Sequence, residues 1–125
     1  MNQISSDVIR GYIDTMILFI LLDGPSYGYE ISRRIREISM EKYTIKETTL
    51  YSAFTRIEKN GYVTSFSQNA DNGKRRTYYQ ITPEGEQYYT LKCEEWQLTQ
   101  EVVSRFTTGR LRIGTIQDTT VVRKG

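Results

Sequence analysis

The chain has no histidine and a single cysteine, Cys93, among its 125 residues. A structural zinc ion needs several cysteine or histidine ligands, so such a site is excluded, and one cysteine forms no disulfide within the chain. Without histidine there is no Ser-His or Cys-His pair for nucleophilic catalysis, and no paired carboxylates stand at a recognisable catalytic spacing. We therefore predict that the protein is not an enzyme and takes no metal ion or cofactor.

Long apolar runs are also lacking. The run from Met16 to Leu22 is far too short to cross a bilayer, and the first residues lack the basic segment that opens a secretory signal. Apolar residues make up 38% of the chain and charged residues 26%, which is ordinary for one folded domain. We predict a cytoplasmic protein with no membrane contact. The net charge of +2 does not by itself mark a nucleic-acid binder, because the local distribution of charge matters more.

Apolar residues spaced three and four apart predict three helices in the first half of the chain. The helices are expected over Val8–Leu22, over Tyr27 to about Ser39 with Ser26 as the N-cap, and over Lys46–Asn60 with Gly61 as a left-handed stop. The third helix turns these apolar residues inward: Leu50, Ala53, Phe54 and Ile57.

The spacing then changes to the alternation that is typical of strands. Strands are predicted over Tyr62–Phe66 and Arg76–Ile81, and the polar segment between them contains the turn sequence Asp71–Gly73. Thr82 is a plausible cap for a last helix that continues to about Phe106.

The order of these elements is typical of a winged helix-turn-helix. The predicted fold class is therefore mainly α (α+β), with a long C-terminal dimerisation helix. We expect a DNA-binding domain at residues 1–82, the dimerisation helix at residues 83–106 and a flexible tail at residues 107–125.

In a helix-turn-helix the second helix of the pair enters the major groove, and the hairpin wing lies beside it. The third predicted helix leaves hydroxyl groups, a phenol and a guanidinium on its outer face, and three cations end the hairpin loop. Such features taken singly usually belong to an ordinary solvated surface, but here they coincide in the order that this fold requires. The predicted DNA-binding residues are Tyr27, Thr48, Thr49, Tyr51, Ser52, Thr55, Arg56, Lys74, Arg75 and Arg76.

Two apolar stripes run along the last predicted helix. Tyr89, Trp96 and Val103 recur every seven residues, and Leu91 and Leu98 do the same on an adjacent stripe. One small domain is not expected to cover both stripes, so the sequence predicts a homodimer through these five residues. The alternative is that they cover only the core of their own chain.

The chain resembles the PadR family of bacterial transcriptional regulators over residues 8–106, in particular its compact branch with one C-terminal helix. Three motifs together are specific for that family, although each alone is weak: YGYEI, TLY with the following RIE, and RRTYY with the following IT. The segments that carry the resemblance are GYIDTMILFILL (11–22), YGYEI (27–31), TTLY (48–51), RIE (56–58), RRTYY (75–79) and IT (81–82).

The resemblance implies a homodimer that binds a palindromic double-stranded operator. It also implies effector sensing, because some compact members are multidrug sensors in which an aromatic compound stacks on a tryptophan of the last helix. Trp96 stands at that position, and the alternative is that it only fills the dimer interface. The ligand-binding residues implied are Ile13, Asp14, Ile17, Trp96, Thr99 and Gln100.

The sequence thus predicts a sequence-specific transcriptional regulator, most simply a repressor, that responds to a small aromatic or cationic effector. The alternative is a winged-helix protein–protein interaction module that does not read DNA. Salt dependence separates the two, because binding to DNA releases counterions and weakens steeply as salt rises.

Overall fold

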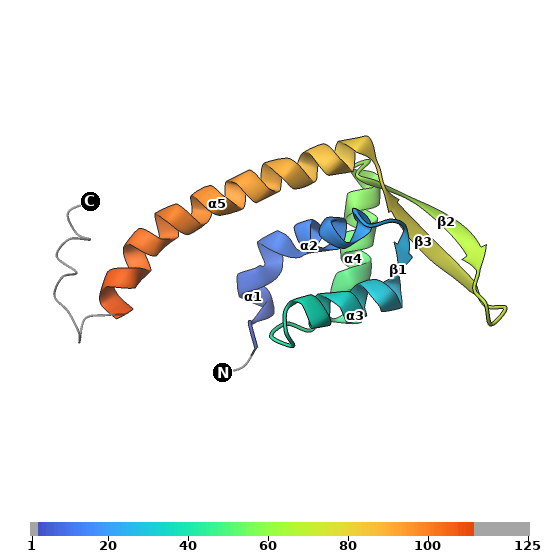
Figure 1. The fold of residues 1–125 in the computed structure, drawn as a ribbon, viewed down its shortest axis with the longest axis horizontal. Coiled ribbons are helices and arrows are strands. Elements are labelled where there is room, and N and C mark those ends of the chain that lie inside the picture. The colour runs from blue at the N-terminus through green and yellow to red at the C-terminus, as the bar shows by residue number, and fades with distance from the viewer. Residues whose placement is uncertain (1–2, 112–125) are drawn as a thin grey trace. The chain divides into compact units, whose positions relative to one another are not determined.

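The computed structural model describes residues 3–111, with side chains described up to residue 108. This part consists of helices and a three-stranded sheet (Figure 1), so the predicted fold class is confirmed. Contacts divide the chain into two units, the first ending at Thr90 and the second beginning at Leu91. The predicted tail at residues 107–125 is helical as far as Leu111, and its remainder lies outside the described residues.

The first predicted helix is interrupted. It consists of α1 (Ser6–Ile9), a 3-10 turn η1 (Arg10–Tyr12) and α2 (Ile13–Leu21). The prediction of one continuous helix over Val8–Leu22 was therefore wrong. Gly11, a weak helix former, lies within the interruption, and the backbone at Tyr12 (φ −120°, ψ 4°) leaves the α-helical region.

Ser26 does not cap the second helix, contrary to the prediction. It lies in a short strand β1 (Ser26–Tyr27), whose backbone pairs with β3, and α3 (Gly28–Ile38) follows directly. The Ser26 hydroxyl instead donates a hydrogen bond to the Glu30 carboxylate, with 2.7 Å between Oγ and Oε1. The pairing with a distant strand outweighs the local capping preference of serine.

The third helix, α4 (Glu47–Lys59), confirms the prediction within a residue at each end. Its last turn is closed by Gly61, whose φ of +82° lies in the left-handed region that favours glycine. The loop that leads into α4 contains two non-glycine residues in the same region, Met40 (φ 56°) and Glu41 (φ 66°). Tyr43 and Ile45, both buried, fix the rest of that loop to the core.

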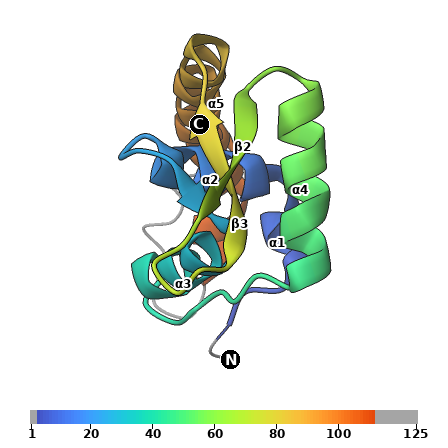
Figure 2. The same ribbon diagram turned by 90° about the vertical axis from the view of Figure 1, so that its right-hand side faces the viewer.

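The wing is the hairpin formed by β2 (Val63–Asn69) and β3 (Arg75–Ile81). The sheet order is β1-β3-β2, and the antiparallel register joins Val63 to Ile81 at the base and Asn69 to Arg75 at the tip. Both strands are longer than predicted, and in Figure 1 the hairpin extends beyond the helices of the first unit. Figure 2 shows α4 running beside the sheet.

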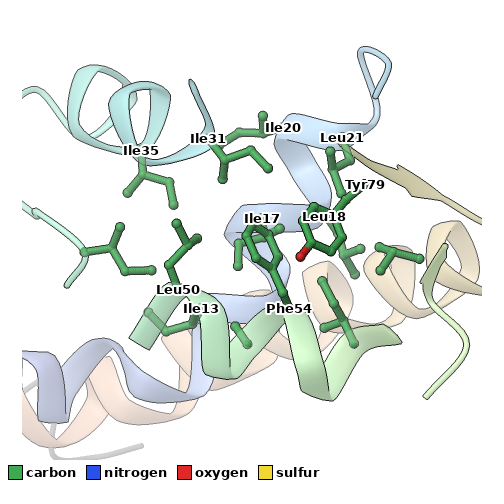
Figure 3. Close-up of a cluster of buried hydrophobic side chains, with 14 of the residues drawn as sticks. Ile13, Ile17, Leu18, Ile20, Leu21, Ile31, Ile35, Leu50, Phe54 and Tyr79 are labelled. Atoms are coloured by element: carbon green, nitrogen blue, oxygen red, sulfur yellow. The ribbon is translucent and has the colours of Figure 1, made fainter. Parts of the chain in front are cut away.

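One hydrophobic core joins α2, α3, α4 and the sheet (Figure 3). All four predicted inner residues of α4 belong to it, each no more than 2% exposed. Phe54 stacks on Tyr79 of β3, with 4.0 Å between ring centroids and 16° between planes. This contact fixes the wing to the helix that precedes it.

The last helix, α5 (Pro83–Leu111), continues past the predicted end at Phe106. Thr82 caps it as predicted, because the Gly85 backbone N–H donates to the Thr82 Oγ1 at 3.0 Å. The Thr82 hydroxyl itself donates to the Gly61 carbonyl at 2.7 Å. In the part of the chain that the structure describes, no helix combines the length and hydropathy needed to cross a membrane.

Candidate nucleic-acid interface

The outer face of α4 carries the hydroxyl-bearing residues that the sequence assigns to DNA. Thr48, Tyr51, Ser52 and Thr55 are exposed and Thr49 is half-buried. The inward apolar residues of the same helix are buried, so these five side chains point away from the core. The Thr55 hydroxyl donates to the Tyr51 carbonyl at 3.1 Å.

Tyr51 connects this outer face to the N-terminus of α3. Its ring packs edge-on against Phe54, with 5.3 Å between centroids, and 46% of the residue remains exposed. A methyl group added at Gly28 would overlap the Tyr51 hydroxyl. Glycine at position 28 therefore allows α3 and α4 to approach closely at the point where Tyr51 reaches the surface.

Arg56, also assigned to DNA, is engaged within the protein. Its Nε lies 2.9 Å from Oδ2 of Asp14 and its Nη2 lies 2.5 Å from Oδ1, which is a bidentate ion pair. The hydrogen bonding with Asp14 raises the pKa of the Arg56 guanidinium above its ordinary value, and partial burial opposes that rise. Asp14, implied as a ligand-binding residue, thus has both carboxylate oxygens occupied by Arg56.

The tip of the wing presents its cations through a short, ordered turn. Gly73 (φ 84°) reverses the chain, and the Lys74 backbone N–H donates to the Asn72 Oδ1 at 3.0 Å. Arg75 donates to the Asn69 Oδ1 at 3.3 Å across the first rung of the hairpin. The side chains of Lys74 and Arg75 belong to exposed residues at the end of the wing.

Arg76 lies over an aromatic ring from β1. Its Cζ is 4.2 Å from the centroid of the Tyr27 ring, a cation–π contact. Tyr27 in turn packs edge-on against Tyr78, with 5.4 Å between centroids, and Tyr78 stacks on Phe66 at 5.7 Å. Tyr27 therefore supports the guanidinium of the wing, a role that the sequence did not indicate.

Tyr27, Tyr51 and two cations of the wing line an open hollow of about 390 Å³, which we call the tyrosine hollow. It brings together four predicted residues, Tyr27, Tyr51, Arg75 and Arg76, although they come from three separate parts of the chain. Its further lining residues are Gly28, Tyr29, Thr77 and Tyr79. Tyr29 and Thr77 were not predicted from the sequence. Alternation along β3 is the signal that would have found Thr77, because it shares a face with Arg75.

The residues implied for effector binding do not gather in one place within the first unit. Ile13 and Ile17 are 2% and 0% exposed, so both face the core of their own chain. A different face of α2 lines an apolar hollow of about 310 Å³ together with α3 and Tyr89. The Oγ1 of Thr15, which lines it, is buried and has no hydrogen-bond partner among the described residues. The described residues contain no group of three or more His, Cys, Asp or Glu side chains that could hold a metal ion.

The predicted dimer residues differ in their surroundings. Tyr89 is half-buried and packs against the core of its own chain, with its ring centroid 6.3 Å from that of Phe19. Leu91 and Leu98 are 62% and 61% exposed, and Val103 is 49% exposed. Trp96 is 41% exposed, Thr99 is half-buried and Gln100 is exposed. Further along α5, Val102 and Phe106 add exposed apolar surface.

Comparison with known proteins identifies the family. Residues 17–91 match the model of the transcriptional regulator PadR-like family. A transcriptional regulator from Clostridium thermocellum is 61% identical, with a TM-score of 0.76, covering 82% of this chain and 99% of that one. A PadR family regulator from Clostridium difficile is 37% identical, with a TM-score of 0.67, covering 77% and 98%.

A relative from Lysinibacillus sphaericus, itself described only as uncharacterised, is 37% identical over 107 residues, which are 86% of this chain and 98% of that protein. The residues that the family model matches run from α2 into the first part of α5. The chain therefore belongs to the PadR-like family of transcriptional regulators, which are DNA-binding proteins and not enzymes.

Proposed function

We propose that the protein is a sequence-specific repressor that inserts α4 into the major groove and rests its wing on the flanking phosphates. The tyrosine hollow supports this proposal, because Tyr51 of α4 lines it together with Arg75 and Arg76 of the wing. Hydroxyl and phenol groups suit base edges and phosphate oxygens, and the cations suit phosphates. The proposed DNA contacts are Tyr27, Thr48, Thr49, Tyr51, Ser52, Thr55, Lys74, Arg75 and Arg76.

We further propose that the protein acts as a homodimer, with residues 1–82 as the DNA-binding domain, residues 83–106 as the dimerisation helix and a flexible tail after them. Exposed Leu91, Leu98, Val102 and Val103 within one helix support a second copy as the covering partner. Two-fold symmetry would then present two copies of α4 to a palindromic operator, with half-sites about one helical turn apart. The DNA partner implies that the protein acts in the cytoplasm.

The apolar hollow beside α2 supports an effector, and it favours one chemical class. Its lining is almost entirely apolar, and the one carboxylate implied for cation binding, Asp14, is already paired with Arg56. A neutral aromatic compound fits this surface better than a cation does.

The test is a titration of the full-length protein against the labelled duplex upstream of its own gene and a scrambled duplex of equal length, across a salt series. We expect preference for the native duplex and a steep slope of log Kd against log salt, about 0.9 for each phosphate contacted. Equal, weak binding to both duplexes at every salt concentration would instead favour the protein–protein interaction module.

The dimer has its own test, light scattering after size exclusion. One chain has a mass of 14.6 kDa, and the wild type should have twice that mass in solution. Leu98→Glu places a charge on the exposed apolar surface of α5 and should give a monomer, whereas Gln97→Glu changes a neighbouring polar residue and should leave the dimer intact. A wild-type monomer would contradict the dimer proposal.

A further inference from the structure

The ion pair between Arg56 and Asp14 joins two helices that are far apart in the sequence. The two residues are 42 positions apart, whereas the next longest ion pair of the described residues, Arg34 with Asp23, spans 11. The Asp14 side chain is only 15% exposed, and that of Arg56 is 50% exposed. The carboxylate is therefore held near the core, in the first turn of α2, with both oxygens accepting from one guanidinium.

The place of Arg56 on α4 separates it from the residues that point outward. At 3.6 residues per turn, Thr48, Tyr51 and Thr55 share one side of the helix, while Leu50 and Ile57 share the opposite side. Arg56 falls on the flank between these two sides. A guanidinium in that position turns toward α2, which is where Asp14 lies.

Apolar packing alone leaves the rotation of a helix loosely defined, because it is not directional. A bidentate contact between guanidinium and carboxylate is directional and adds geometric specificity to the charge. The fork uses Nε and Nη2 of Arg56, so a phosphate bound by that edge of the guanidinium would displace Asp14, and a largely buried carboxylate would lose both of its donors.

We propose that Arg56 is a positioning residue, which fixes the rotation of α4 on α2 through Asp14 so that the outer face of α4 meets the DNA, and that it does not itself bind a phosphate. This inference rests on the proposed DNA-binding function, and it revises the sequence-based assignments of Arg56 to DNA and of Asp14 to a ligand. The observation that supports this inference is the bidentate contact between the Arg56 guanidinium and the Asp14 carboxylate.

Four full-length proteins separate the two roles: the wild type, Asp14→Asn, Arg56→Lys and the double variant. Lysine keeps the positive charge but cannot form the fork, so a positioning role predicts that Arg56→Lys binds the native duplex on the order of tenfold more weakly. Asp14→Asn should weaken binding to a similar degree, and the double variant should be no weaker than either single variant. The slope of log Kd against log salt should stay at the wild-type value.

A phosphate contact predicts the opposite pattern. Arg56→Lys would then bind nearly as tightly as the wild type, and Asp14→Asn would bind equally or more tightly because a competing carboxylate is gone. A fifth protein, Arg56→Gln, removes the charge and would in that case lower the salt slope by about 0.9 for each subunit. This pattern would overturn the proposal.

Thermal unfolding of the same four proteins supplies a readout that does not involve DNA. If the fork exists in solution, Asp14→Asn and Arg56→Lys each lower the Tm, and the double variant falls by less than the sum of the two shifts. Additive shifts overturn the positioning role whatever the DNA data are. Coupled shifts without any DNA binding by the wild type would instead refute the proposed function and the positioning for DNA together, leaving only a structural ion pair.

Discussion

Two clusters of three cations differ in what surrounds them. The α3 arginines, Arg33, Arg34 and Arg36, each face a carboxylate, with ion-pair distances between 2.7 and 3.9 Å. The wing cations, Lys74, Arg75 and Arg76, form no ion pair with any of the described residues. Arg75 bonds a neutral amide and Arg76 lies over a tyrosine ring.

The difference explains how a chain with a net charge of only +2 can still present a cationic surface. A cation paired with a neighbouring carboxylate adds little to the field at a distance, because the opposite charges cancel within a few ångströms. An unpaired cation keeps its full field for an anionic partner. Two runs of basic residues that look alike in sequence therefore have different value for binding phosphates.

The largest expected effect on DNA affinity comes from removing the three unpaired cations of the wing. The variant Lys74→Gln/Arg75→Gln/Arg76→Gln should bind the native duplex on the order of 100-fold more weakly, taking about 0.5 kcal/mol for each of six contacts in a dimer. Its salt slope should fall by up to about five. Fluorescence anisotropy measures both quantities, and an unchanged slope would show that the wing does not touch phosphates.

A smaller effect is expected from the ring that supports Arg76. Tyr27→Ala removes the cation–π contact and should weaken DNA binding by about five- to thirtyfold, since such a contact contributes about 0.5–1 kcal/mol in each subunit of a dimer. Tyr27→Phe keeps the ring and loses only the hydroxyl, so this matched variant should bind more tightly than Tyr27→Ala if the ring matters through Arg76. If both variants were equally weak, the phenol hydroxyl rather than the ring would be the important group.

The base of the wing should also respond to pH. Burial raises the pKa of the Tyr79 phenol, and the charge of Glu58 and the nearby Tyr51 add to the rise. A folded-state pKa above the unfolded value of about 10 means that this stability is complete below that pH and is lost as pH rises through the folded pKa.

The alkaline arm of a urea-unfolding series measures this dependence. The free energy of unfolding of the wild type should fall as pH rises above about 10, and Tyr79→Phe should flatten that fall. Tyr43, whose pKa burial also raises, contributes with the same sign and accounts for the part that remains. Identical alkaline arms in the two proteins would contradict the assignment to Tyr79.

The smallest effect on DNA affinity is expected from removing the paired arginines of α3. Arg33→Gln/Arg34→Gln/Arg36→Gln removes the same charge as the wing variant, yet it should change affinity for the native duplex by less than about threefold. Stability should change little as well, because ion pairs at the protein surface contribute little net free energy. An effect as large as that of the wing variant would show that total charge, and not its pairing, controls binding to DNA.

Sequence periodicity was enough to predict α3, α4, the hairpin and the cap at Thr82, because each depends on residues only a few positions apart. The Phe54 and Ile57 positions, for example, follow from helical spacing alone. Predictions that depended on a distant partner were less complete. The pairing of Ser26 with Tyr79 replaced a helix cap by a strand, and local preference gives no sign of that pairing.

The same limit applies to the candidate site. The residues of the α4 outer face and the wing tip could be named from the sequence, since exposure follows from periodicity. The ion pair of Arg56 with Asp14 could not be named, because it depends on how α2 and α4 cross. The support of Arg76 by Tyr27 likewise depends on β1 lying next to β3.

Thr82 has a further consequence for how insertions should be tolerated during evolution. It is the single residue between β3 and α5, and its hydroxyl bonds Gly61 on one side and Gly85 on the other. One residue inserted there would turn every later side chain of the helix by about 100° relative to the strand. The loop between Asn69 and Arg75 has no such role, and lengthening it alters only the reach of the wing. We therefore expect relatives to vary in length at the wing tip and to keep a constant spacing from Ile81 to Gly85.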